Sequence, residues 1–262
     1  MTFTLLAAGA YDPTAAGAQL AWQQADGNAV ILRDGGVQAL PGSHPALGGD
    51  RVAWRTDGQV TLAAAATSAP LERHPVPDAG ALALGDGLLA WRTRDAAGRD
   101  RLWVLGPAGE GRLLAEAAPQ EELGRPAIAA GRILCHVAGP RGSRLLSIDP
   151  GTGRRSVLRH EPGALLSNPA SDGLDLLYVR ATGRDQQLRL GPLSAGAVTG
   201  DLRLLVHPSS GRRDAEHEPH RARHRHGRRP PPLPPRAQPG VVDTLWTTAL
   251  APDAAYVTLV RG

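Results

Sequence analysis

The stretch Pro45-Ala-Leu-Gly-Gly49-Asp-Arg-Val-Ala-Trp54 decides the fold, because its pattern recurs along the chain. The pattern is a proline, three residues, a glycine, four residues and an aromatic ring, which we take as the anchor. The five anchors are Trp22, Trp54, Trp91, His136 and Tyr178. An internal repeat of this kind fixes the architecture before any single residue is interpreted.

The positions before each anchor repeat as well. The proline position holds Pro13, Pro45, Leu82, Ala127 and Pro169, with Pro126 one step out of register in the fourth copy. The glycine position holds Gly17, Gly49, Asp86, Gly131 and Gly173. The residues directly before the anchors are Ala21, Ala53, Ala90, Cys135 and Leu177.

Each copy contains short strands separated by tight turns. Residues 50–55 form an expected strand after a glycine turn, and residues 59–63 form the next one after Asp57-Gly58, a strong hairpin signal. Further expected strands are 88–92, 101–105, 144–148 and 187–190. Because most segments have only four to six residues, the chain leaves little room for helices and we expect an all-β fold.

The repeat length indicates a β-propeller. The anchors are 32, 37, 45 and 42 residues apart, near the roughly 40 to 45 residues of one four-stranded blade. We predict one domain, a six-bladed propeller of mostly four-stranded antiparallel blades. The expected blades are 11–42, 43–78, 79–121, 122–162, 163–208, and 240–262 together with 1–10. In the last, incomplete blade, residues 2–8 supply the outermost strand and join the two termini, which removes sheet edges.

The anchors are interpreted as core between blades. A small residue fits where two sheets approach closely, and the ring beside it fills the wider space on the opposite face. The same reasoning makes Cys135 and His136 a buried thiol and a core histidine rather than a catalytic Cys-His pair.

Composition excludes several classes of protein. The 262 residues carry a formal net charge of +4 and include no lysine. The single cysteine excludes an intramolecular disulfide and a cysteine-based zinc cluster. The chain contains no run of about 18 apolar residues, so the sequence predicts no membrane-spanning helix. Residues 1–10 lack the basic start of a signal peptide.

Two turn-and-strand segments resemble a known family of repeats. Pro169-Ala-Ser-Asp-Gly173 with the strand through Tyr178, and Ala251-Pro-Asp-Ala254 with Tyr256-Val-Thr, resemble the Ser-Pro-Asp-Gly turn of TolB-like, WD40-like propeller repeats. The resemblance implies a bacterial, six-bladed and usually non-enzymatic propeller that binds proteins or peptides, often in the bacterial envelope. It transfers no partner-binding residue, because the matching positions are turns and core.

One segment, residues 209–239, interrupts the repeat, and we expect it to be a disordered loop rich in His, Arg and Pro. Residues 211–236 carry a net +5, so the remainder of the chain is close to neutral. Three ligand hypotheses remain beside that of a solvated linker. Its arginines could bind phosphates or another anionic surface. Its histidines could bind a transition-metal ion, and its prolines could bind an SH3-type groove. The residues concerned are His217, His220, His224 and His226 for the metal, and Pro231, Pro234 and Arg236 for the groove.

The sequence assigns no catalytic, cofactor-binding or metal residue and no cofactor, because it lacks the nucleophile elbow, phosphate-loop, zincin and dinucleotide motifs. We therefore predict a non-catalytic, monomeric scaffold that binds a protein or peptide rather than nucleic acid. The alternatives are a propeller hydrolase with carboxylates in an axial cleft, and a metal or anion sensor that works through the insertion.

Overall fold

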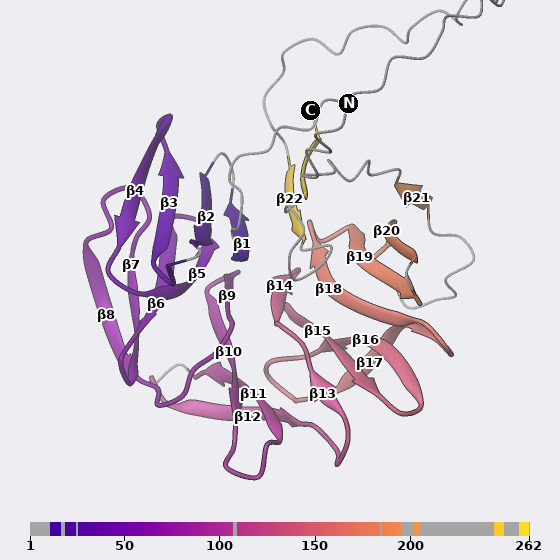
Figure 1. The fold of residues 1–262 in the computed structure, drawn as a ribbon. Coiled ribbons are helices and arrows are strands. Elements are labelled where there is room, and N and C mark those ends of the chain that lie inside the picture. The colour runs from indigo at the N-terminus through magenta and orange to yellow at the C-terminus, as the bar shows by residue number, and fades with distance from the viewer. Residues whose placement is uncertain are drawn as a thin grey trace, which may run out of the picture.

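A computed structural model describes the chain in eight segments: residues 11–16, 19–24, 26–106, 109–183, 185–194, 202–204, 244–248 and 257–261. The regular elements of these segments are all β-strands. Antiparallel sheets follow one another along the chain and are arranged around a common centre (Figure 1).

The sheets follow sequence order. The first contains β1 (Tyr11–Ala16), β2 (Gln19–Gln23), β3 (Ala29–Arg33) and β4 (Gly36–Leu40). The second contains β5 (Ser43–Gly48), β6 (Arg51–Thr56), β7 (Gln59–Ala64) and β8 (Pro70–Pro75). The third contains β9 (Leu82–Gly85), β10 (Leu88–Arg94), β11 (Asp100–Leu105) and β12 (Gly111–Glu116).

The fourth sheet has five strands, because two short strands share its inner edge. It contains β13 (Glu122–Leu123), β14 (Ala127–Ala129), β15 (Arg132–Gly139), β16 (Gly142–Ile148) and β17 (Arg155–Glu161). The fifth contains β18 (Leu165–Ser171), β19 (Asp175–Thr182), β20 (Asp185–Pro192) and β21 (Leu202–Leu204). A final pair is formed by β22 (Thr244–Thr248) and β23 (Val257–Arg261).

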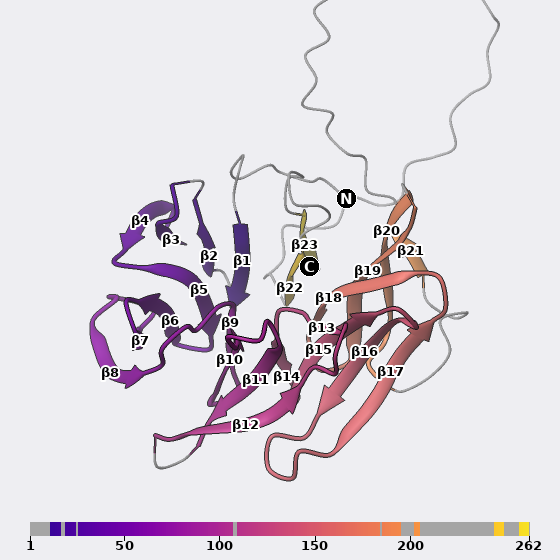
Figure 2. The same ribbon diagram turned by 60° about the horizontal axis from the view of Figure 1, so that its bottom comes forward.

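The innermost strands form a ring. β1 contacts β5, β5 contacts β9, β9 contacts β14, and β14 contacts β18. β22 contacts both β18 and β1, so the two-stranded sheet lies between the last and first blades, as two views of the ribbon also show (Figures 1 and 2). Meander sheets packed around such a ring define a β-propeller. The predicted all-β propeller of mostly four-stranded antiparallel blades is confirmed.

The number of blades differs from the prediction. The structure has five blades, not six, because the last repeat copy contributes only β22 and β23 among the described residues, where the other sheets have four or five strands. The predicted closing strand at residues 2–8 lies outside the described residues, as does the predicted insertion at 209–239.

The turns and anchors explain why these short segments form blades. The Asp57-Gly58 hairpin joins β6 to β7, with Gly58 at φ +72° as a tight turn requires. Trp54 on β6 is 1% exposed and packs against Ala21 and Ile31 of the first blade. Trp91 packs in the same way against Ala53 of the second. The predicted inter-blade role of these two rings is confirmed.

Neighbouring inner strands approach closely enough to require glycine. A Cβ added to Gly48 on β5 would lie 2.5 Å from the backbone carbonyl of Leu84 on β9. This contact between backbones sets the spacing of the second and third blades at the axis.

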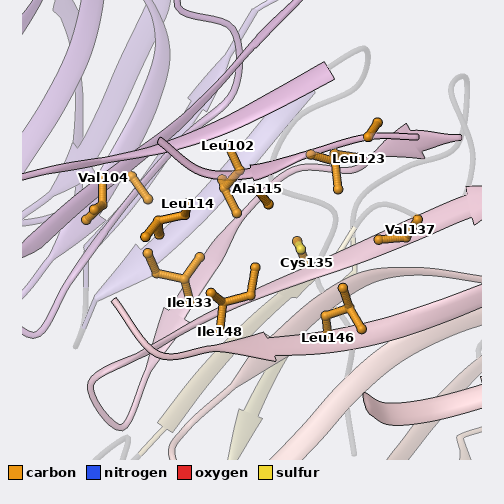
Figure 3. Close-up of a cluster of buried hydrophobic side chains, with 12 residues drawn as sticks. Leu102, Val104, Leu114, Ala115, Leu123, Ile133, Cys135, Val137, Leu146 and Ile148 are labelled. Carbon is orange, nitrogen blue, oxygen red and sulfur yellow. The ribbon is translucent and has the colours of Figure 1, made fainter. Parts of the chain in front are cut away.

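In the fourth blade, the residue at the anchor position lies one residue earlier in the chain than the repeat pattern predicts. The pairs Gly48–Arg51 and Ala129–Arg132 flank equivalent two-residue turns, so Cys135 rather than His136 occupies the position of Trp54. Cys135 lies with Ile133 and Val137 against the third blade (Figure 3). His136 is on the opposite face, because side chains alternate along a strand. The expectation that His136 is an anchor ring is wrong.

No helix in the described part of the chain is long and apolar enough to cross a membrane.

Candidate functional site

A β-bulge interrupts three of the innermost strands. The register of β1, β5 and β18 shifts at Asp12, His44 and Asn168, which have φ values of 48°, 50° and 50°. Each of these residues precedes a proline. A left-handed conformation is costly for a residue with a side chain and persists only where the surrounding structure holds it. The bulges therefore place polar side chains at equivalent positions around the ring.

The fourth blade carries an arginine at the matching place. Arg125 precedes Pro126 between β13 and β14, in the gap that divides the inner edge of this blade. Its Nη1 lies 3.6 Å from Oδ1 of Asp12, and its Nη2 donates to the carbonyl oxygen of Pro45 at 3.5 Å. His44 Nδ1 donates to Oδ2 of Asp12 at 2.5 Å. Three blades thus meet through three side chains.

Arg125 spans the axis of the ring. β14 stands three places from β1 and two from β5 in the order of contacting inner strands, yet Arg125 reaches residues of both. A side chain that joins opposite members of a ring must cross its centre. The end of the propeller where the inner strands begin is therefore occupied by this guanidinium.

Asp12 is ionised in this setting. Burial alone would raise its pKa, but Arg125, the hydrogen bond from His44 and the nearby Arg92 outweigh burial and lower the pKa to about 2. Arg92, on β10, also donates from Nη1 to the carbonyl oxygen of Leu123 at 2.9 Å. We call Asp12, His44, Arg92, Arg125 and His136 the axial cluster.

His136 supports the segment that carries Arg125. A Cβ added to Gly124 would lie 1.8 Å from the imidazole of His136, so the ring packs directly on a glycine. Burial, aided by the positive charge of Arg92, lowers the pKa of His136 to about 4, although Asp100 acts in the opposite direction. Its buried Nδ1 has no hydrogen-bond partner among the described residues. At neutral pH His136 is a neutral ring.

This pKa predicts weaker folding in mild acid. The unfolded histidine binds its proton near pH 6.5 and the folded one only near pH 4, so the unfolded state gains protons first. We expect the free energy of unfolding to fall by about 2 to 3 kcal/mol between pH 7 and pH 4 because of this group. Urea unfolding at a series of pH values measures it, and His136→Gln is expected to flatten that slope. The exposed His160→Gln is the control, and an equal slope in both variants would contradict the assignment.

Cys135 is a core thiol. It is 0% exposed within the cluster between the third and fourth blades, and burial raises its pKa to about 12 in spite of Arg155. Because a thiol in that state is protonated at neutral pH, it is a poor nucleophile. Cys135 and His136 face opposite sides of β15, Cys135 toward the third blade and His136 toward Gly124.

The thiol is expected to be unreactive until the protein unfolds. We predict that an aromatic disulfide reagent at pH 8 modifies native Cys135 at least about a hundredfold more slowly than the same chain in urea, since its thiolate is suppressed. Absorbance of the released thiolate follows the reaction. A native rate similar to that of the unfolded chain would show that the thiol is accessible and ionised.

The remaining residues singled out from the sequence lie outside the described part of the chain. They are His217, His220, His224, His226, Pro231, Pro234 and Arg236. Within the described residues, no group of three or more His, Cys, Asp or Glu side chains is arranged to hold a metal ion.

Sequence reasoning missed the axial cluster, although a signal was present. The residues that precede Pro13, Pro45 and Pro126 are polar and differ from copy to copy, while the residues around them repeat. Variable polar residues at a fixed repeat position are typical of a surface position rather than of core. Aligning the fourth copy on Pro126 instead of Ala127 would have placed Arg125 in this set.

The ring of meander sheets places the chain among the β-propellers, and comparisons with solved structures agree. TolB from Acinetobacter baumannii matches with a TM-score of 0.52 and 16% identity over 71% of this chain and 52% of that one. A chain of the nidogen/laminin complex matches with a TM-score of 0.50 and 16% identity, over 70% of this chain and 76% of that one. The Swd1 propeller domain of Myceliophteria thermophila matches with a TM-score of 0.50 and 17% identity, over 72% of this chain and 68% of that one.

These likenesses confirm the resemblance to TolB-like and WD40-like propellers at the level of fold. The match covers about half of the TolB chain. No protein-family model matches the sequence, and no curated protein matches it significantly. An oligogalacturonate lyase in complex with manganese matches at a TM-score of 0.49, which is too distant to bear on activity.

Proposed function

We propose that the chain is a non-catalytic, monomeric scaffold that binds a protein or peptide at the axial end of the propeller. One observation carries the proposal: polar side chains from four blades gather where the inner strands begin, as Asp12, His44, Arg92 and Arg125. Ligand sites commonly combine a rigid frame with polar groups presented by loops and strand ends. One structure of similar fold is the nidogen/laminin complex, an assembly of proteins. Residues 209–239 would then be a linker within a single domain.

A hydrolase is the second candidate, because the 2.5 Å pair of Asp12 and His44 resembles the carboxylate–imidazole pairs of acid–base catalysis. A glycosidase-like site needs a carboxyl group that stays protonated near neutral pH. The pKa of Asp12 is lowered to about 2 rather than raised. The lowered pKa of Asp12 therefore argues against a role of this carboxyl group as a general acid.

An array of immobilised ten-residue peptides tests the scaffold proposal. We expect the purified full-length chain to retain a subset of peptides and to release them with unchanged mass. The double variant Arg92→Gln, Arg125→Gln should lose these signals. The matched control Arg99→Gln, whose partners are Asp95 and Glu116 on the third blade, should keep them.

Three outcomes would overturn the proposal. An array without retained peptides contradicts peptide binding at this site. Retention that is unaffected by the double variant places the binding surface elsewhere. Cleavage of the retained peptides, lost in His44→Gln, supports the hydrolase instead.

A further inference from the structure

The axial cluster holds more positive than negative charge. It contains two guanidiniums, of Arg92 and Arg125, and the single carboxylate of Asp12. His136 adds none at neutral pH, because its pKa is about 4. The cluster therefore has one guanidinium more than it has carboxylates. The neighbouring acid, Asp100, is itself paired with Arg94 and accepts a hydrogen bond from the backbone N–H of Leu123.

Arg125 is also incompletely satisfied. A guanidinium has five N–H donors. Among the described residues, those of Arg125 have two partners, at 3.6 Å and 3.5 Å, both longer than a charge-assisted hydrogen bond of about 2.7 to 2.9 Å. The side chains of Asp12, His44 and Arg125 are 26%, 27% and 23% exposed, so solvent reaches them.

We propose that the axial cluster binds a carboxylate group of its ligand, with Arg125 and Arg92 as the recognising residues. This inference rests on the proposed peptide-binding function and names the chemistry that the site would recognise. Asp12 already shows how a carboxylate fits there, because it lies between His44 and Arg125. The ligand's carboxylate joins or replaces it on the same guanidinium.

Charge and shape favour a carboxylate over a phosphate. A carboxylate has one negative charge and a planar pair of oxygens, which matches the fork of an arginine in a bidentate contact. One such charge neutralises the excess of the cluster, whereas a phosphate dianion would leave it negative next to Asp12.

The carboxylate can come from an acidic side chain or from a free chain end, and three probes distinguish these sources. The first is acetyl-Gly-Gly-Glu-Gly-amide, the second is acetyl-Gly-Gly-Gly-Gly with a free carboxylate, and the third is acetyl-Gly-Gly-Gln-Gly-amide. Succinate and inorganic phosphate are added as small anions. Binding to the full chain is followed by NMR from the shifts of arginine Nε–H resonances.

We expect one of the two acidic probes, and succinate, to bind at least about tenfold more tightly than the glutamine probe and phosphate. Arg125→Gln should weaken that binding by about tenfold or more. Asp12→Asn should strengthen it severalfold, because it removes the internal competitor while keeping its shape. Arg99→Gln is the control that should change nothing, and the unfolding curve of each variant shows that it is folded.

The proposal is overturned if all probes bind equally, if phosphate binds most tightly, or if Arg125→Gln and Arg99→Gln behave alike. These results differ from failure of the proposed function. Succinate binding without any retained array peptide keeps the carboxylate site and rejects the peptide scaffold. Retained peptides without a preference for carboxylates keep the scaffold and reject this site.

Discussion

Replacing Trp54 with alanine is expected to lower the free energy of unfolding by about 3 to 5 kcal/mol, one of the two largest effects that we predict. The indole is 1% exposed and fills the space between the first and second blades beside Ala21 and Ile31. Because the surrounding side chains relax only partially into the space left by the indole, the loss includes a cavity contribution besides the lost apolar burial. Urea unfolding followed by circular dichroism measures the loss.

Two controls show whether the position or the loss of apolar surface is responsible. Leu174→Ala removes a side chain that is 80% exposed and should change the free energy of unfolding by less than about 0.5 kcal/mol. Cys135 lies at the equivalent position in the fourth blade. Cys135→Ala should lower the free energy of unfolding by only about 1 kcal/mol, because a thiol fills far less volume than an indole. Similar losses for Trp54→Ala and Leu174→Ala would contradict the inter-blade packing.

Arg159→Ala is expected to cost about 3 to 5 kcal/mol, because it leaves several carbonyl groups without their donor. The side chain is 1% exposed and donates to the carbonyl oxygens of Leu158, Pro192 and Ser194 at 2.7 to 2.9 Å. It thereby joins β17 of the fourth blade to the end of β20 in the fifth. Thermal and urea unfolding both measure the loss.

The matched control for Arg159 is Arg154→Ala, an exposed arginine just before β17. It should change the free energy of unfolding by less than about 0.5 kcal/mol. Arg159→Lys should recover little, because one ammonium group cannot reproduce the fork of donors. Full stability of Arg159→Lys would show that charge alone, and not this geometry, joins the two blades.

The architecture was predictable because short sequence patterns that recur along the chain specify the strands and turns of each blade. The Asp57-Gly58 turn and the alternation around Trp54 specify a hairpin and its buried faces without information from distant residues. The blade count was less accessible. It depends on how many strands the last copy contributes, and there the structure describes only β22 and β23.

The predicted alignment of the fourth copy is wrong by one residue, and the reason is physical. The alignment sought a ring at the anchor and took His136, but the space between the third and fourth blades is filled by several aliphatic side chains around the small Cys135. Backbone conformation identifies the position more reliably than side-chain size. Ala130 adopts φ 51°, matching Gly49 at 60° and Asp86 at 50°.

The axial cluster could not have been derived from spacing alone. Its members come from four blades, and Arg125 meets Asp12 only because the ring closes and brings opposite inner strands to one axis. The sequence contained the polar residues before the prolines. Their convergence, and the low pKa of Asp12 that results from it, arise from the assembled ring.

Hydrogen–deuterium exchange with and without the tightest array peptide tests the central claim, that the axial end of the propeller is the binding surface. We predict that the peptide slows exchange in residues 11–14, 43–46 and 122–125, and leaves the outermost strands β4, β8 and β12 unchanged. Slower exchange confined to those outermost strands, with the axial segments unaffected, would contradict the account.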